Sequence, residues 1–224
     1  MNLEEIRANF AANANPADKI PMEAYMRNLF EFYGIRASKR RDISRPYIKE
    51  AKKSNQIDRD FLEILFKDPK REINYLGLDI LKAQTHLLKL SDFDKLVSLA
   101  TIRPWWDTID NIDTIIGYLG LVENDFDKKI LKLAEEDNFW LRRIAIGHQR
   151  KYKEKTKTDL LAKIIKINLE IPCQDKDEKF FINKAIGRAL REYSKTNPAW
   201  VRDFVDKKKN DLVPLSIREA SKYL

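Results

Sequence analysis

The chain has 224 residues, with 43 Lys and Arg against 35 Asp and Glu, and its formal net charge is +8. A hydrophobic content of 43% is enough for a continuous core and excludes an intrinsically disordered chain. One cysteine, Cys173, excludes an internal disulfide, and the sequence has neither a secretory signal nor an apolar run long enough for a membrane span, so we expect a cytoplasmic protein.

The positive charge favours a polyanionic partner, although many helical proteins carry such an excess only for solubility. His86, His148 and Cys173 are the only soft metal ligands in the chain, so we expect no metal site.

Apolar residues recur at three- and four-residue spacing along the chain, which predicts a series of amphipathic helices. The first stripe contains Ile6 and Phe10, and the second contains Met22, Met26, Leu29, Phe30 and Tyr33 and ends at Gly34. Further breaks are expected at Asp68-Pro69, Arg103-Pro104, Ile171-Pro172, Asn197-Pro198 and Val213-Pro214. Asn197 is expected to be the N-cap of the helix that follows it, and Ser216 with Glu219 predicts a capping box at the start of the last helix.

Short motifs return at nearly constant spacing, with Arg71, Trp106, Arg142, Asn183 and Arg218 about 35 to 41 residues apart. This period is typical of helix-pair repeats of the HEAT type. We therefore predict an all-α fold, a HEAT-like superhelix in which helix pairs form a curved solenoid, as one domain over residues 1–224. Equivalent positions would line a concave basic groove that includes Arg71, Trp106, Arg142 or Arg143, and Lys184. The alternative is that these cations only solvate the helix starts.

The segment from Pro104 to Asp110 is the most unusual in the chain, because two adjacent tryptophans and two acids open a helix. Trp106 and Asp110 are four residues apart and therefore share a helical face. An aromatic ring attracts cations, and a carboxylate can stabilise an oxocarbenium-like sugar. The alternative is that both tryptophans belong to the core and that Asp107 and Asp110 complement the helix dipole.

Two later segments supply further candidates. Trp140, Ile144, Gly147 and His148 share one stripe that we expect to be buried, and His148 is expected to be a packing residue. Arg143 lies off this stripe and could reach a phosphate or a carboxylate. In the helix expected over 179–193, a basic edge is formed by Lys184, Arg188 and Arg191, which fits phosphate contacts but also an ordinary solvent-facing stripe.

Five segments together resemble the AlkD family of DNA alkylation repair glycosylases. They are Pro21 to Asn28 with Phe32 to Ile35, Trp105 to Asp110, Trp140 to Arg143, Phe180 to Gly187, and Leu215 to Ala220. They stand in the family's order and cover nearly the whole chain. The resemblance implies a monomeric enzyme that cradles double-stranded DNA and hydrolyses the N-glycosidic bond of cationic purines such as 7-methylguanine and 3-methyladenine, without metal or cofactor.

The resemblance also implies roles for individual residues. Trp106 would contact the lesion, Asp110 would be the catalytic aspartate, and Arg143 would support Asp110 and the nearby DNA backbone. The residues expected to contact DNA are Tyr25, Arg27, Arg36, Arg40, Arg41, Arg71, Arg142, Lys184, Arg188 and Arg218.

The sequence departs from the family pattern at two positions. Arg188 stands where the family has a second tryptophan in its cleft, and Arg36 stands where the family often has an uncharged polar residue. A guanidinium offers no electron-rich face and repels a cationic purine. A DNA-binding relative without base excision is therefore an alternative, and a HEAT-type scaffold for a protein partner is a third.

Overall fold

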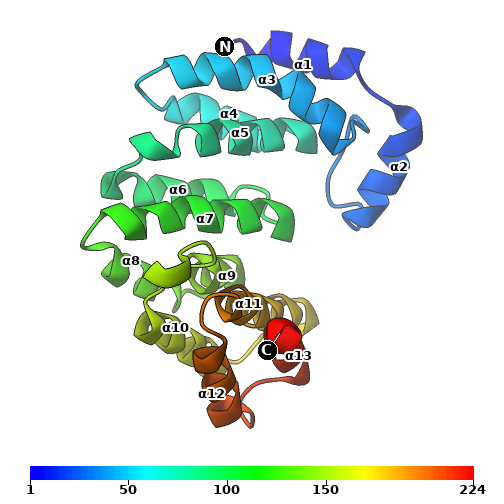
Figure 1. Cartoon of the computed structure of the whole chain (residues 1–224). Coiled ribbons are helices and arrows are strands. Elements are labelled where there is room, and N and C mark those ends of the chain that lie inside the picture. Colours follow the sequence, from blue (N-terminus) through cyan, green and yellow to red (C-terminus); the bar gives the residue numbers. More distant parts are fainter. The chain divides into compact units, whose positions relative to one another are not determined.

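The computed structural model describes all 224 residues, and it contains 13 α-helices, four short 3-10 helices and no strand (Figure 1). The all-α prediction is confirmed. The helices form two compact units, Met1–Leu88 and Lys89–Leu224. That these units make a single solenoid domain stays a prediction, and each is described here by itself.

The first unit is built around helix α5, against which both α3 and α4 pack. Its helices are α1 (Leu3–Ala12), α2 (Pro16–Tyr25), α3 (Ala37–Lys53), α4 (Arg59–Lys67) and α5 (Arg71–Ala83), followed by the 3-10 turn Thr85–Leu87. Buried Leu65, Phe66, Ile73, Leu76 and Ile80 supply the core between α4 and α5. The carboxylate of Glu72 accepts hydrogen bonds from the main-chain amides of residues 33 to 35, which ties α5 to the segment before α3.

The second unit contains the repeats on which the site depends. Its helices are α6 (Phe93–Thr101), α7 (Trp106–Val122), α8 (Phe126–Leu133), α9 (Phe139–Gly147), α10 (Thr158–Glu170), α11 (Lys176–Ser194), α12 (Pro198–Lys208) and α13 (Pro214–Ala220), with 3-10 turns at Leu90–Asp92, Lys153–Lys155 and Ser221–Tyr223. The second helices of successive pairs form a row, because α7 packs on α9, α9 on α11 and α11 on α13. Of the repeating residues predicted from the sequence, Trp106, Arg142, Asn183 and Arg218 fall on these helices, and Arg71 begins α5 of the first unit.

Helix boundaries follow the local chemistry at most of the expected breaks. Helices α4, α6 and α10 end just before Pro69, Pro104 and Pro172. Asn197 caps α12 as predicted, since its side chain accepts a hydrogen bond from the amide of Trp200, 3.0 Å away. These residues therefore fix where the repeats begin and end.

Two boundary predictions are wrong. Helix α2 ends at Tyr25 and not near Gly34, because Arg27 and Asn28 adopt left-handed φ angles of 55° and 56° that stop the helix. Leu29, which was expected in the core, is 53% exposed as a result. Ser216 does not cap the last helix, since α13 begins at Pro214 and the Ser216 hydroxyl donates to the main-chain oxygen of Asn183 instead.

The stripe on α9 is buried as predicted, and it brings α9 unusually close to α7. A Cβ atom at Gly117 would lie 2.1 Å from the main-chain oxygen of His148, so only glycine allows this approach. His148 is a packing residue, as predicted: its ring is buried, and Nδ1 lies 2.6 Å from the Ala145 oxygen. Burial lowers the pKa of His148 to about 4, which keeps the imidazole neutral.

None of the 13 α-helices combines the length and the apolar character that are needed to cross a bilayer.

Candidate functional site

The start of α7 presents one tryptophan to the core and leaves the next one partly accessible. Trp105 is 8% exposed, and its ring lies 5.6 Å from the ring of Trp140 and 5.2 Å from that of Phe181. Trp106 is half-buried, and so is Asp110, one turn further along the same helix. The expected pairing of an aromatic ring with a carboxylate on one face of a helix is therefore present.

The carboxylate of Asp110 is held by two arginines from different helices. Nη2 of Arg143, on α9, donates to Oδ1 at 2.8 Å, and Nη1 of Arg188, on α11, forms an ion pair with Oδ2. The Arg143 side chain is 4% exposed, that of Asp110 13% and that of Arg188 30%. Asp110 is therefore reached from solvent on the side of Arg188, while Arg143 supports it from the interior.

Arg143 is fixed in place by contacts besides Asp110. Its Nη1 donates to the main-chain oxygen of Phe181 at 2.6 Å, and its guanidinium lies over the Phe181 ring, 5.7 Å from the centroid. Burial lowers the pKa of Arg143, and the Asp110 carboxylate opposes that effect by stabilising the charged form. A buried guanidinium that donates through both Nη atoms, with its Nε left without a partner, can orient a carboxylate.

Arg188 differs from Arg143 because its side chain reaches solvent while it pairs with Asp110. With both arginines in place, the single negative charge of Asp110 faces two positive charges. A cation that approaches Trp106 therefore meets a net positive site as long as Arg188 stays where it is.

Two charged residues that sequence reasoning missed lie beside this site. Asp113 follows Asp110 on α7, and Arg150 lies in the turn after α9, where its guanidinium contacts both the Asp113 carboxylate and the main chain of Asp110. The available signal was that Asp113 lies on the helical stripe of Ile109, Ile112 and Ile116, since an acid on such an apolar stripe needs a buried partner.

The predicted basic edge of α11 is engaged in ion pairs with acids of other helices. Lys184 and Arg191 both pair with Glu219 of α13, and the Lys184 distance is 2.9 Å. Glu219 is 2% exposed. These two cations therefore stabilise the packing of α11 on α13. Arg218, one residue earlier on α13, is exposed.

Two of the expected DNA contacts need correction, because Arg71 and Arg142 are buried. Arg71 is 0% exposed, and its guanidinium lies 3.8 Å from the centroid of the Phe30 ring. Arg142 is 2% exposed and forms a buried ion pair with Glu178 of α11. The spacing of the repeats identified these positions correctly, but the helices turn them inward, so both are structural residues.

The remaining candidates in the first unit are exposed or partly exposed. Tyr25 is 72% exposed at the end of α2, and Arg27 is exposed just beyond it. Arg36 is exposed and pairs with Asp18 at 2.6 Å. Arg40 is more constrained, since it pairs with Asp79 of α5 at 2.6 Å.

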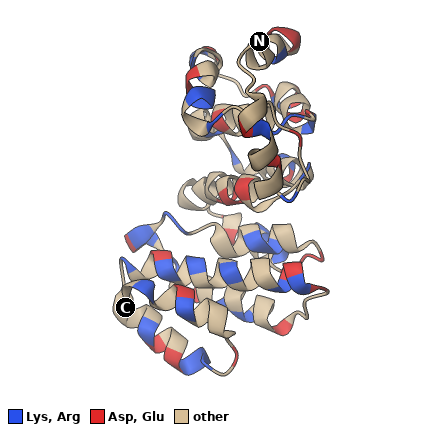
Figure 2. Cartoon of the chain, turned by 90° about the vertical axis from the view of Figure 1, so that its right-hand side faces the viewer, with Lys and Arg blue, Asp and Glu red and all other residues tan.

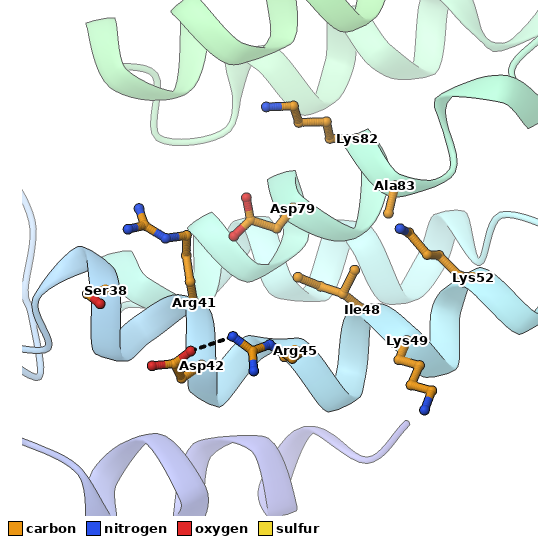
Figure 3. Close-up of a pocket in the computed structure, with 10 residues that line it drawn as sticks. All are labelled: Ser38, Arg41, Asp42, Arg45, Ile48, Lys49, Lys52, Asp79, Lys82 and Ala83. Carbon is orange, nitrogen blue, oxygen red and sulfur yellow. Dashed lines mark hydrogen bonds and ion pairs between the residues drawn. The ribbon is translucent and has the colours of Figure 1, made fainter.

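Arg41 belongs to a basic groove of about 840 Å³ between α3 and α5 (Figure 3). The groove residues are Ser38, Arg41, Asp42, Arg45, Ile48, Lys49, Lys52, Asp79, Lys82 and Ala83. Five of these side chains are cationic and two are acidic. From Arg41 to Lys52 the α3 residues span about 16 Å of helix axis, a length that matches roughly five phosphate steps of one DNA strand.

Lys and Arg as well as Asp and Glu lie on helices of both units (Figure 2). The α3 groove has an excess of cations, although Arg45 pairs with Asp42 within it at 2.7 Å. Among the His, Cys, Asp and Glu side chains, no group of three or more is arranged to hold a metal ion.

The comparisons with known proteins agree with the family resemblance seen in the sequence. The family described as "DNA alkylation repair enzyme" matches residues 6–224. A solved structure described as a predicted DNA alkylation repair enzyme from Enterococcus faecalis is 32% identical, with a TM-score of 0.84 over 94% of this chain and 96% of that chain. No curated protein sequence matches. The chain belongs to the family of DNA alkylation repair enzymes.

Proposed function

We propose that the protein is a DNA glycosylase that hydrolyses the N-glycosidic bond of cationic alkylated purines, such as 7-methylguanine and 3-methyladenine, in duplex DNA. The observation that carries the proposal is the pairing of half-buried Trp106 with Asp110 one turn later, with buried Arg143 holding the carboxylate 2.8 Å away.

In the proposed reaction, the bond between the sugar C1′ and the purine nitrogen breaks, and its electron pair goes to the base. A cationic purine leaves as a neutral molecule, so it needs no protonation. Asp110 stabilises the positive charge that develops on the sugar, and Trp106 offers its ring face to the cationic base. A water oxygen then bonds to C1′ and releases its proton to solvent or to Asp110.

DNA binding would draw on exposed cations of both units. We propose that Tyr25, Arg27, Arg36, Arg40 and Arg41 contact DNA in the first unit. In the second unit the proposed contacts are Lys184, Arg188 and Arg218. Arg71 and Arg142 are left out because their guanidinium groups are buried.

The test is release of base from methylated duplex DNA under single-turnover conditions with micromolar protein, measured by mass spectrometry. We expect 7-methylguanine to be released faster than it is spontaneously. Asp110→Asn, which keeps the shape of the side chain but removes its charge, should reduce the rate to the spontaneous level. A wild-type rate that equals the spontaneous rate would refute the proposal.

The ion pair between Arg188 and Asp110 favours a second candidate, a protein that binds damaged or unusual DNA without excising the base. The pair lowers the negative potential of Asp110 and places a cation where a cationic base would sit. This candidate predicts salt-dependent DNA binding together with the absence of base release. DNA affinity that does not change between 50 and 200 mM salt would count against both candidates and favour a scaffold for a protein partner.

A further inference from the structure

A second carboxylate is buried three residues after Asp110 and is clamped by Arg150. Asp113 is 1% exposed. Nε of Arg150 donates to Oδ2 of Asp113 at 2.9 Å, and Nη2 lies 2.7 Å from Oδ1 and 2.6 Å from Oδ2. The Arg150 side chain is 8% exposed. Asp113 and Arg150 therefore form a forked ion pair between α7 and the turn after α9.

The same guanidinium also reaches the residue that carries the candidate catalytic carboxylate. Nη2 of Arg150 donates to the main-chain oxygen of Asp110 at 2.7 Å. Arg143 holds the side chain of Asp110, so this residue is fixed at its backbone by one arginine and at its carboxylate by another.

The pair of Asp113 and Arg150 is closely packed, so its two side chains have room for only one arrangement. A Cβ atom at Gly147 would lie 2.3 Å from Oδ2 of Asp113 and 3.4 Å from Nε of Arg150. Since real Cβ contacts are not that short, the absence of a side chain at position 147 is what admits the pair. A displacement of Asp113 or Arg150 would therefore be transmitted to α7.

A buried ion pair is a poor source of stability, since apolar residues of similar volume often stabilise a fold as well or better. Its position suggests a different role. We propose that Asp113 and Arg150 are positioning residues: Asp113 orients the Arg150 guanidinium, which holds the Asp110 main chain so that the Asp110 carboxylate faces the substrate. This inference rests on the proposed base excision.

The charged groups that face Asp113 come from four places. They are Arg150 in the turn after α9, Arg143 on α9, Arg188 on α11 and Asp110 on α7 itself. Burial raises the pKa of Asp113 to about 7, although Arg150 opposes the shift. Protonation of Asp113 near neutral pH would leave Arg150 without its counter-charge and alter its hold on Asp110.

The test uses Asp113→Asn, Arg150→Met and the double variant in the full chain, with single-turnover base release and DNA affinity both measured per folded molecule. We expect each single variant to lose about 10- to 100-fold in rate with little change in DNA affinity, since a misplaced catalytic group costs this much. The double variant should regain stability but not rate. Recovery of rate together with stability, or a wild-type rate in Asp113→Asn, would overturn the proposal.

Glu178→Gln is the matched control, because it breaks a comparable buried pair, with Arg142, that has no contact with Asp110. It should lose stability and keep the wild-type rate per folded molecule. An equal loss of rate in this variant would mean that any buried ion pair of the unit affects the site, and the specific role of Asp113 would be refuted.

A measurement without substrate separates this inference from the proposed function. The ¹³C signal of the Asp110 carboxyl, assigned by its loss in Asp110→Asn, should shift in Asp113→Asn and Arg150→Met relative to the wild type and stay in place in Glu178→Gln. If wild-type protein releases no base but this shift is seen, the glycosylase proposal fails and the positioning pair stands. A signal that Asp113→Asn and Arg150→Met leave unmoved would refute the positioning pair.

Discussion

Replacing Arg188 with tryptophan should raise base release from methylated DNA. The change removes one of the two positive charges that neutralise Asp110, and it supplies a second ring for a cationic base. Arg188 is 30% exposed, so its charge acts through a medium between water and protein interior. Two unit charges 4 Å apart interact by about 1 kcal/mol in water and about 4 kcal/mol near a protein surface, and we take about 1 to 3 kcal/mol for the relieved repulsion.

The new ring adds about 0.5 to 1 kcal/mol for a cation at an exposed position. The sum, about 1.5 to 4 kcal/mol, corresponds to roughly 10- to 900-fold in the single-turnover rate. Arg188→Gln isolates the charge, so it should give most of this gain without the contribution of the ring. Both variants should be assayed on methylated duplex DNA beside the wild type, with DNA affinity measured in parallel.

The outcome for DNA affinity matters as much as the rate. Loss of a phosphate contact by Arg188 would weaken binding of undamaged DNA, while loss of repulsion should favour only DNA that contains a cationic base. If neither variant releases base faster than the wild type at saturating protein, Arg188 is not the obstacle, and the reasoning from the Asp110 ion pair is refuted.

Three further predictions concern other parts of the chain. Burial alone would raise the pKa of Glu219, but hydrogen bonds from lysines such as Lys222 lower it to about 2, below its ordinary 4.5. The stability that ionised Glu219 contributes is therefore present above pH 4.5 and lost as the pH falls through 2. In Glu219→Gln, the urea midpoint of unfolding, followed by circular dichroism, should fall less steeply between pH 4.5 and pH 2 than it does in the wild type. Arg41→Ala combined with Arg45→Ala should reduce the salt dependence of DNA affinity by up to about two units of slope, and an unchanged slope would exclude the α3 groove from DNA binding. Gly147→Ala should lower the thermal midpoint, because its methyl group would press on the buried acid nearby, and a wild-type midpoint would show that the turn yields easily.

Many helix ends could be predicted because proline and asparagine act on the backbone of their own segment. The breaks at Pro69, Pro104 and Pro172 and the Asn197 cap needed no tertiary information. The end of α2 could not be predicted in this way. Arg27 and Asn28 take left-handed φ angles, which asparagine favours but arginine does not, and the apolar period continues past the real end of the helix.

The site was predictable where its residues are close in sequence and less so where they are not. The spacing of Trp106 and Asp110 fixes their common face on α7. The repeat period located Arg142 and Arg143 but did not settle which of them turns inward toward Glu178 and which reaches Asp110. The clamp of Asp113 by Arg150 joins residues 37 apart, and only the packing of α7 against the turn after α9 brings them together.

Asp110 connects three helices, and this has a consequence for how its neighbourhood responds to sequence change. Arg143 of α9 and Arg188 of α11 compete for one unit of negative charge, so the effect of altering either depends on whether the other is present. Substitutions at these positions should therefore show strong epistasis in double-mutant cycles. The order of substitutions at positions 110, 143 and 188 would therefore matter when an aromatic residue at position 188 is gained or lost. Loss of Asp110 before either arginine, for example, leaves the buried Arg143 charge without a counterion.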